Sequence, residues 1–217
     1  MTKLADKYGT DKGHGGQGHL YTEIYELFFL PIKSTAVKIG EIGIEKGSSL
    51  QMLRDYFPQA VIYGIDIEDK SQFNSARIKT FVADQSKRDQ LENFVMEAGS
   101  DFDIIIDDGG HTMDQQQISL GYLFSRIKPG GIYIIEDVHT SYYGSYYNVE
   151  KDGSNATSVM IQRYMRTGKM ASKYLTPEET AYLNSNIEYC NLFFRNMNTM
   201  CCVLKKKSDA ANDKPLT

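Results

Sequence analysis

The chain has 217 residues, a length that fits one domain built around a full β-sheet. Its hydrophobic content of 41% and charged content of 24% are ordinary for a soluble domain, and no apolar run approaches the roughly 20 residues of a membrane span. The net charge of −4 argues against bulk attraction to nucleic acid phosphate. We therefore expect neither a nucleic acid nor a membrane as partner.

The N-terminal region holds a glycine- and histidine-rich loop at residues 13–19, followed by a predicted helix at residues 21–30 that ends before Pro31. The first residues lack the apolar core of a secretory signal, which predicts a cytoplasmic protein. The three cysteines (Cys190, Cys201, Cys202) are too few for a disulfide framework, so we expect reduced packing residues.

From residue 37 to residue 137, short β-branched runs alternate with helical patterns, which predicts βαβ units around a parallel sheet. We expect strands at 37–43, 60–66, 78–83, 102–107 and 131–137, and helices at 48–56, 86–98 and 113–127, with a less regular one near 70–76. The run Pro129-Gly130-Gly131 predicts a stop and a turn before the fifth strand.

A glycine loop follows the first predicted strand, with the sequence Glu41-Ile42-Gly43-Ile44-Glu45-Lys46-Gly47-Ser48-Ser49. The glycines allow a tight turn and close approach to a ligand, and a serine can cap the next helix. The Gly-x-Gly-x-x-Gly fingerprint of dinucleotide-binding proteins is missing, and the charge of Glu45 would repel a phosphate. These two features count against a nicotinamide-dependent oxidoreductase, which stays an alternative from another class.

Two acidic clusters follow the fourth and fifth predicted strands: Asp107-Asp108-Gly109-Gly110-His111 and Glu136-Asp137-Val138-His139. The carboxyl ends of parallel strands share one rim of a sheet, so these groups should face one crevice. Because such crowding of like charge is unfavourable without a counter-ion, the clusters predict a divalent metal site.

The last third of the chain breaks the alternation. A long excursion at residues 138–186 opens with four tyrosines between positions 142 and 147, which favours a binding surface on the substrate side and could also pack on a second copy in a homo-oligomer. Residues 187–194 and 199–205 read as the arms of an antiparallel hairpin. Lys205-Lys206-Lys207 is read as the solvated end of a final strand, and residues 208–217 as a flexible tail.

Parallel repeats followed by one antiparallel hairpin resemble the Rossmann-like sheet of class I methyltransferases, an α/β fold with seven, mostly parallel strands. The acidic-x-Gly-x-x-x-Gly pattern is similar to the S-adenosylmethionine loop of that family. The resemblance implies that Asp66 binds the ribose hydroxyls and that Asp84, with Gln85, meets the adenine amino group. The cofactor-binding set that it implies is Glu41, Gly43, Gly47, Ser48, Asp66, Asp84, Gln85 and Asp107.

A narrower resemblance covers roughly residues 7–205. The motifs Lys7-Tyr8-Gly9-Thr10-Asp11-Lys12 and His19-Leu20-Tyr21, together with Tyr25 and both acidic clusters, resemble the metal-dependent sugar O-methyltransferases of macrolide biosynthesis, of the mycinamicin and tylosin tailoring type. This resemblance implies Asp108 and Asp137 as metal ligands, with Glu136 in support, and His111 as general base. Substrate contacts are expected from His139, Tyr142, Tyr143, His19 and Tyr21.

The expected function is therefore S-adenosylmethionine-dependent O-methylation of a sugar or glycosylated small molecule. A vicinal diol would chelate Mg²⁺ or another divalent cation. A catechol or phenolic acceptor is an alternative within the same class, because adjacent oxygens chelate a metal in the same way. A non-catalytic cofactor-binding or assembly module is an alternative from another class. We expect a cap segment at residues 1–36 that folds over cofactor or acceptor, with Asp11, His19 and Tyr21 inside, and a methyltransferase domain at residues 37–207.

Overall fold

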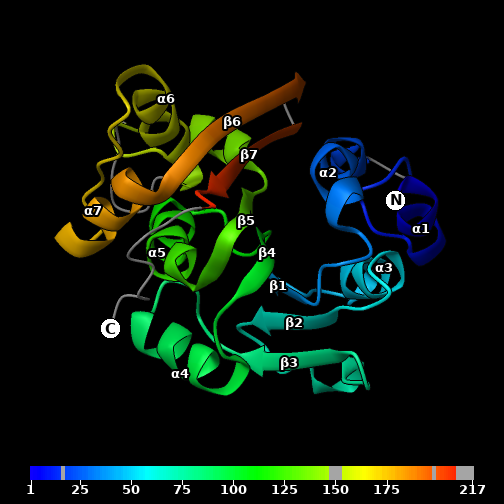
Figure 1. Cartoon of the computed structure of the whole chain (residues 1–217). Coiled ribbons are helices and arrows are strands. Elements are labelled where there is room, and N and C mark those ends of the chain that lie inside the picture. The colour runs from blue at the N-terminus through cyan, green and yellow to red at the C-terminus, as the bar shows by residue number, and fades with distance from the viewer. Residues whose placement is uncertain (16–17, 147–152, 197–198, 209–217) are drawn as a thin grey trace.

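The computed structural model describes residues 1–15, 18–146, 153–196 and 199–208. A seven-stranded sheet in the order β3-β2-β1-β4-β5-β7-β6 forms its centre (Figure 1). The strands are β1 (Lys38–Ile42), β2 (Val61–Asp66), β3 (Ile78–Val82), β4 (Phe102–Asp107), β5 (Ile127–Ile135), β6 (Ile187–Asn196) and β7 (Thr199–Lys206). Strands β1 to β5 run parallel, and β7 pairs antiparallel with β5 and with β6. The expected parallel sheet with a C-terminal antiparallel hairpin is confirmed.

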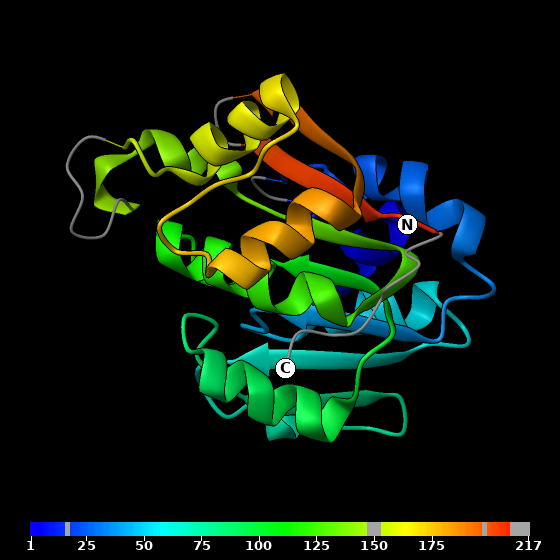
Figure 2. The same ribbon diagram turned by 60° about the vertical axis from the view of Figure 1, so that its left-hand side comes forward.

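Helices cover both faces of this sheet. The α-helices are α1 (Thr2–Tyr8), α2 (Tyr21–Phe29), α3 (Ser48–Tyr56), α4 (Arg88–Ala98), α5 (Met113–Leu123), α6 (Thr157–Thr167) and α7 (Pro177–Asn186). Helices α1 to α3 lie on one side of the sheet and α4 to α7 on the other (Figures 1 and 2). Among the described residues, no helix is long and apolar enough to cross a bilayer.

The buried strand β4 shows how the two hydrophobic cores arise. Side chains of successive strand residues point to opposite faces. Ile104 and Ile106 therefore join the core beneath α1 to α3, whereas Ile105 joins the core beneath α4 to α7. Because β4 is covered on both faces, all six of its residues are buried, and the run Ile104-Ile105-Ile106 shows no alternation with polar residues.

The entry into β5 differs from the sequence prediction. The strand already begins at Ile127, so Pro129-Gly130-Gly131 lies within it instead of preceding it. The pairing jumps from Phe102 opposite Ile127 to Ile104 opposite Ile132, so that the Pro-Gly-Gly run forms an irregularity in the ladder. The predicted helix at 113–127 accordingly ends early: α5 stops at Leu123, and the 3₁₀ helix η3 (Phe124–Arg126) leads into the strand.

Other local differences lie outside the sheet. The helix expected near residues 70–76 is only the 3₁₀ helix η2 (Ser71–Phe73). The excursion contains the 3₁₀ helices η4 (Val138–Tyr142) and η5 (Gly144–Tyr146) as well as α6 and α7. A sequence signal for α7 exists, since Thr176 and Glu179 form a capping box around Pro177. The fourth tyrosine of the excursion, Tyr147, and residues 209–217 of the predicted tail lie outside the described residues.

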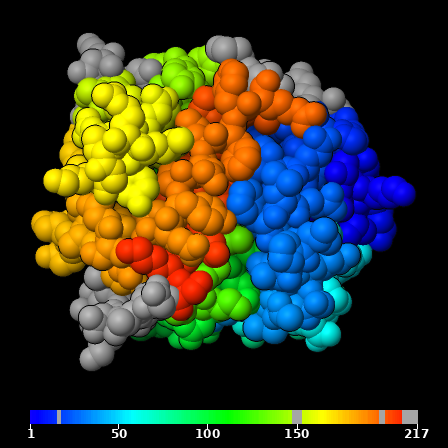
Figure 3. Space-filling model, turned by 45° about the horizontal axis from the view of Figure 1, so that its top comes forward, coloured from blue at the N-terminus to red at the C-terminus, as the bar shows by residue number. Residues whose placement is uncertain are grey.

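The N-terminal helices pack against the distant C-terminal hairpin. In the space-filling view, α2 in blue lies beside β6 in orange (Figure 3). The rings of Phe28 and Phe193 meet edge to face with centroids 5.7 Å apart. An ion pair of 2.6 Å between Glu23 and Arg195 lies at the exposed end of this contact. The N-terminal segment is thus held next to the rim where β5 ends.

Candidate active site

A cavity of about 680 Å³ opens at the carboxyl ends of β1, β2, β4 and β5. Residues 9–12 of the cap segment form part of its wall. The predicted site residues that line it are Gly43, Ser48, Asp66, Asp84, Gln85, Asp108, His111 and Asp137. The carboxyl rim of a parallel sheet is where open α/β sheets bind ligands, and both the glycine loop and the first acidic cluster meet there.

The glycine loop is packed directly on the turn after β4. Gly43 has φ +86°, and a Cβ at this position would overlap the carbonyl oxygen of Asp108. The Asp108 amide donates to the Ile42 carbonyl at 3.0 Å, which fixes the two turns together. Gly47 has φ +70°, and a Cβ there would press on the Phe73 ring. Both predicted glycines thus hold conformations that other residues rarely adopt.

Asp66 supports the glycine loop from β2. One carboxylate oxygen, Oδ2, accepts hydrogen bonds from the amides of Ile44 at 2.8 Å and Glu45 at 3.2 Å. The other oxygen accepts from the Glu68 amide at 2.9 Å. Since Asp66 also lines the cavity, its carboxylate can hold the loop and still accept a hydrogen bond from a ligand hydroxyl.

Asp107, which was predicted to bind the cofactor, lies behind the cavity wall. Its carboxylate is 1% exposed, is not among the groups lining the cavity, and accepts hydrogen bonds from Ser119, from Gln85 Nε2 at 2.9 Å and from the Tyr133 hydroxyl at 3.3 Å. Burial raises its pKa to about 6, against the lowering effect of Ser119 and Gln85. The position of Asp107 therefore does not support direct cofactor contact; the residue holds Gln85, whose Oε1 accepts from the Gly110 amide at 2.6 Å.

Two further predicted cofactor residues differ in placement. Asp84 lines the cavity, and its Oδ1 accepts from the amide (2.8 Å) and hydroxyl (2.7 Å) of Ser86. Glu41 is 1% exposed at the end of β1 and does not line the cavity. Burial raises the pKa of Glu41 to about 7, and the positive charge of Lys12 opposes that rise.

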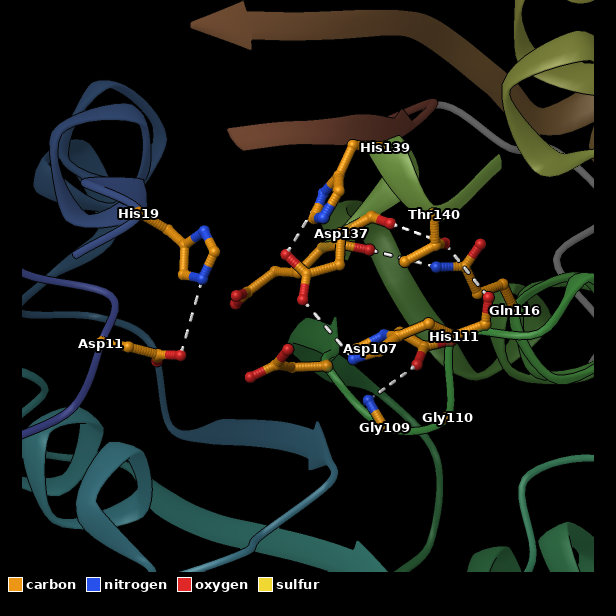
Figure 4. A network of polar contacts seen from close by, with 12 residues as sticks. Asp11, His19, Asp107, Gly109, Gly110, His111, Gln116, Asp137, His139 and Thr140 are labelled. Atoms are coloured by element: carbon orange, nitrogen blue, oxygen red, sulfur yellow. Dashed lines mark hydrogen bonds and ion pairs between the residues drawn. The ribbon is translucent and has the colours of Figure 1, made fainter. Parts of the chain in front are cut away.

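Asp108, His111 and Asp137 form the acidic cluster at the far end of the cavity. One nitrogen or oxygen atom from each lies within 4.8 Å of the others. His111 Nε2 is 3.4 Å from Asp137 Oδ2, and His139 Nδ1 is 3.8 Å from Asp137 Oδ1. Figure 4 shows Asp137 between these two histidines. Burial raises the pKa of Asp108, an effect that Lys12 counteracts and Asp137 reinforces.

The backbone of Asp137 is unusual for a residue with a side chain. It lies in the left-handed region with φ 52°, directly after β5. The buried Tyr21 hydroxyl donates to Asp137 Oδ1 at 2.7 Å and accepts from the Asp137 amide at 3.3 Å. A strained backbone that is held by a buried partner is common at functional sites. Tyr21 thus positions Asp137 from beneath and does not line the cavity itself.

Glu136, predicted to support the metal, is buried behind the cavity. Its carboxylate is 1% exposed, contacts Lys12 Nζ at 2.9 Å and accepts a hydrogen bond from the Tyr25 hydroxyl. Burial raises its pKa to about 7, Lys12 opposes this, and Asp137 adds to it. Lys12 and Tyr25 belong to the motifs quoted above, but no local sequence pattern predicts their contact with an acid more than 100 positions away.

Aromatic side chains gather beyond Asp137. The His19 and Tyr21 rings stack with centroids 5.3 Å apart, and His139 lies 6.4 Å from His19. Tyr143 meets His139 edge-on at 6.1 Å. Tyr142 and Tyr143 are 51% and 39% exposed, so their faces are open to a ligand. Burial lowers the pKa of His139, although the charge of Asp137 works against this.

The cluster suits a divalent cation. Asp108 and Asp137 offer hard carboxylate oxygens, which Mg²⁺ prefers. Four carboxylates, from Asp108, Glu136, Glu41 and Asp11, surround the ammonium group of Lys12, and Asp137 lies close to Asp108 and Glu136. A further positive charge would relieve the repulsion that remains.

Comparison with known proteins agrees with this geometry, although no family model matches the chain. A methyltransferase from the mycinamycin biosynthetic pathway, MycE, solved with Mg and SAH, superimposes with a TM-score of 0.78 at 28% identity over 97% of this chain and 56% of that one. The 8-demethyl-8-alpha-L-rhamnosyl tetracenomycin-C 2'-O-methyltransferase of Streptomyces olivaceus is 36% identical over 75% of this chain and 44% of its own length. This chain has the class I methyltransferase fold and is related to sugar O-methyltransferases.

The mycinamicin VI 2''-O-methyltransferase of Micromonospora griseorubida is a second such relative, 36% identical over 66% of this chain and 37% of its own length. The chain thus spans less than half the length of these two curated relatives. The resemblance to metal-dependent sugar O-methyltransferases, drawn above from the sequence motifs, is confirmed.

Proposed function

We propose that the chain transfers the methyl group of S-adenosylmethionine to a hydroxyl of a sugar or glycosylated small molecule, with the help of Mg²⁺ or another divalent cation. The observation that carries the proposal is one cavity whose wall joins the glycine loop and Asp66 to the cluster of Asp108, His111 and Asp137. The relatives add support, since their names describe O-methylation of a rhamnosyl compound and of mycinamicin VI, and MycE was solved with Mg and SAH.

The glycine end of the cavity would hold the cofactor. The turn at Gly43 and the nearby Ser48 leave room for close backbone approach, and Asp66 would accept hydrogen bonds from ribose hydroxyls. Asp84 and Gln85 follow the next strand, β3, and line the same wall. They would contact the adenine ring of the cofactor. With the ribose and the adenine bound in this way, the methyl group of the cofactor would point toward Asp108 and His111.

Asp108 and Asp137 would hold the cation, on which a vicinal diol of the acceptor could chelate. When bound, the cation would supply Lewis acidity that makes an acceptor hydroxyl easier to ionise. Tyr21 keeps Asp137 in place for this task, and Lys12 does the same for Asp108.

His111 would act as general base. Its Nε2 lies at the cluster, 3.4 Å from Asp137 Oδ2, so that the carboxylate would stabilise the imidazolium formed when the proton of the acceptor hydroxyl is taken up. The resulting oxygen nucleophile would attack the sulfonium methyl group in line, so that the O–C bond forms as the C–S bond breaks and S-adenosylhomocysteine leaves. Much of the rate would come from holding donor and acceptor at about 3 Å.

The acceptor would lie over the aromatic side chains beyond Asp137. His19, His139 and Tyr143 present ring faces and edges near one another, and Tyr142 is exposed beside them. Ring faces pack on the apolar faces of sugars, and hydroxyl and imidazole groups hydrogen-bond to sugar hydroxyls. A homo-oligomer, the absence of a nucleic acid partner and a cytoplasmic location remain predictions from the sequence.

Calorimetric titration with S-adenosylmethionine and, separately, with NAD tests the cofactor assignment. We expect saturable binding of S-adenosylmethionine and none of NAD, because the loop lacks the dinucleotide fingerprint and carries Glu45. Binding of NAD without binding of S-adenosylmethionine would refute the proposal and favour an oxidoreductase.

A further inference from the structure

The cap segment contacts the carboxylates that follow β4 and β5 through a buried cation, Lys12. The Lys12 side chain is 1% exposed. Because lysine is almost never fully buried without a partner, such burial requires opposite charges nearby. Its Nζ forms ion pairs with Asp108 Oδ2 and, at 2.9 Å, with Glu136 Oε2. These carboxylates lie 96 and 124 positions further along the chain and belong to two different strand ends.

Local backbone contacts keep Lys12 at this point. The Thr22 amide donates to the Lys12 carbonyl at 3.0 Å, and the His19 amide donates to the Asp11 carbonyl at 2.7 Å, so the loop before α2 closes on itself. Residues 9–12 form part of the cavity wall. Any displacement of Lys12 would therefore move a wall of the cavity.

Tyr21 and Tyr25 of α2 also contact carboxylates that follow β5. They donate hydrogen bonds to Asp137 and Glu136 from neutral hydroxyl groups and bring no positive charge. At the other end of the segment, Lys7 forms an ion pair with Asp55 at 3.4 Å. The Lys7 side chain is 58% exposed, so this pair is weak because solvent screens it. The strong electrostatic attachment of the segment is therefore the one at Lys12.

We propose that Lys12 is a positioning residue whose ammonium group fastens the cap segment to Asp108 and Glu136, so that the cavity wall and the cation-binding carboxylates are held as one unit. The inference deepens the proposed function, since it concerns the same site, but the fastening does not depend on methyl transfer. Removing a charge from a buried pair leaves the partner uncompensated, which is strongly destabilising. The cost should appear as local opening of the cap segment.

Limited digestion with chymotrypsin, in mildly alkaline buffer with a chelator and without cofactor, tests this fastening. Cut positions are mapped by mass spectrometry, and no cleavage site for this protease is lost in the variants. Cuts after the introduced methionine are left out of the rates, because chymotrypsin also cleaves slowly after methionine. We expect Lys12→Met to be cut at the other sites within residues 1–30 at least about tenfold faster than the unmodified chain. The matched control is Lys7→Met, which should stay within about twofold of the unmodified chain because its pair is exposed.

A double variant separates charge from packing. If the lost charge opens the segment, adding Glu136→Gln to Lys12→Met removes one uncompensated carboxylate and should slow the cleavage again. If Lys12 only fills space, the second substitution adds its own cost and speeds cleavage. Cleavage of Lys12→Met at the unmodified rate, or of the double variant as fast as Lys12→Met, would overturn the proposal.

Glu136→Gln alone covers the case in which Lys12→Met does not fold. This substitution keeps the side-chain volume and removes one of the two carboxylates that form ion pairs with Lys12. Faster cleavage within residues 1–30 is therefore expected in this variant too. An unchanged rate in that variant would overturn the proposal. Since neither cation nor substrate is present, these results do not depend on whether the chain methylates a sugar.

Discussion

His111 is the residue on which the proposed chemistry depends most. It lines the cavity, and its Nε2 is 3.4 Å from Asp137 Oδ2. Asp137 is itself fixed by Tyr21 and by an unusual backbone conformation. The structure thus places an imidazole beside a carboxylate at the cavity wall, which is what the proposed role of His111 as general base requires.

Replacing His111 by alanine should separate binding from turnover. We expect the affinity for S-adenosylmethionine to change by no more than about threefold, and turnover to fall by about a hundredfold or more, because the proton acceptor is lost. His14→Ala is the matched control, since the His14 side chain is 57% exposed and its ion pair with Glu23, at 3.2 Å, lies away from the cavity wall. Unchanged turnover of His111→Ala, measured by the same assay, would reject His111 as base.

At the scale of elements, the turn after β1 and the turn after β4 support each other. The absence of a side chain at Gly43 allows the carbonyl of Asp108 to approach, and Asp108 belongs to the acidic cluster. The glycine loop and the turn after β4 are therefore one packed unit. A change in either turn should disturb the other.

Gly43→Ala tests this mutual packing. We expect a loss of more than about 2 kcal/mol in the free energy of unfolding, from a left-handed backbone together with a clash against Asp108. Gly168→Ala serves as control, because Gly168 has φ +65° but open space around its Cα. It should lose only about 1 kcal/mol, the backbone cost alone. Equal losses in urea unfolding would show that the two turns are not packed as described.

The strands could be predicted from the sequence because each one has a local pattern. The buried strand β4 contains the apolar run Ile104-Ile105-Ile106, and β6 and β7 are two apolar-rich segments that follow one another closely. The irregularity at Pro129 was misread, since a Pro-Gly-Gly run is typical of a turn as well as of a bulge. Helix α6 begins without a side-chain cap, which removes the usual start signal.

At the scale of the whole molecule, parallel topology explains why the acidic residues could be predicted to meet. Asp108 and Asp137 each follow a parallel strand, so their convergence needs no further information. The partners of Glu136 could not be predicted in this way. Lys12 and Tyr25 come from the cap segment, whose position depends on tertiary packing that no local pattern encodes.

The assembled molecule combines three parts: a sheet rim that carries the acids, a glycine loop on that rim, and a cap segment that closes the wall. Each part supplies a wall or a ligand group to the same cavity. Methyl transfer on this scaffold should therefore require the cation site and the cofactor site together.

Mass spectrometry of a panel of glycosides incubated with the protein and S-adenosylmethionine tests the central claim most directly, with chelator and then with Mg²⁺ restored. We predict a product that is heavier by one methylene group, formed at least about a hundredfold faster with Mg²⁺ than with chelator, since the Lewis acid contributes several kcal/mol. Asp108→Asn should abolish this gain. Methylation of a glycoside at the full rate in chelator, or methylation of phenols alone, would contradict the account.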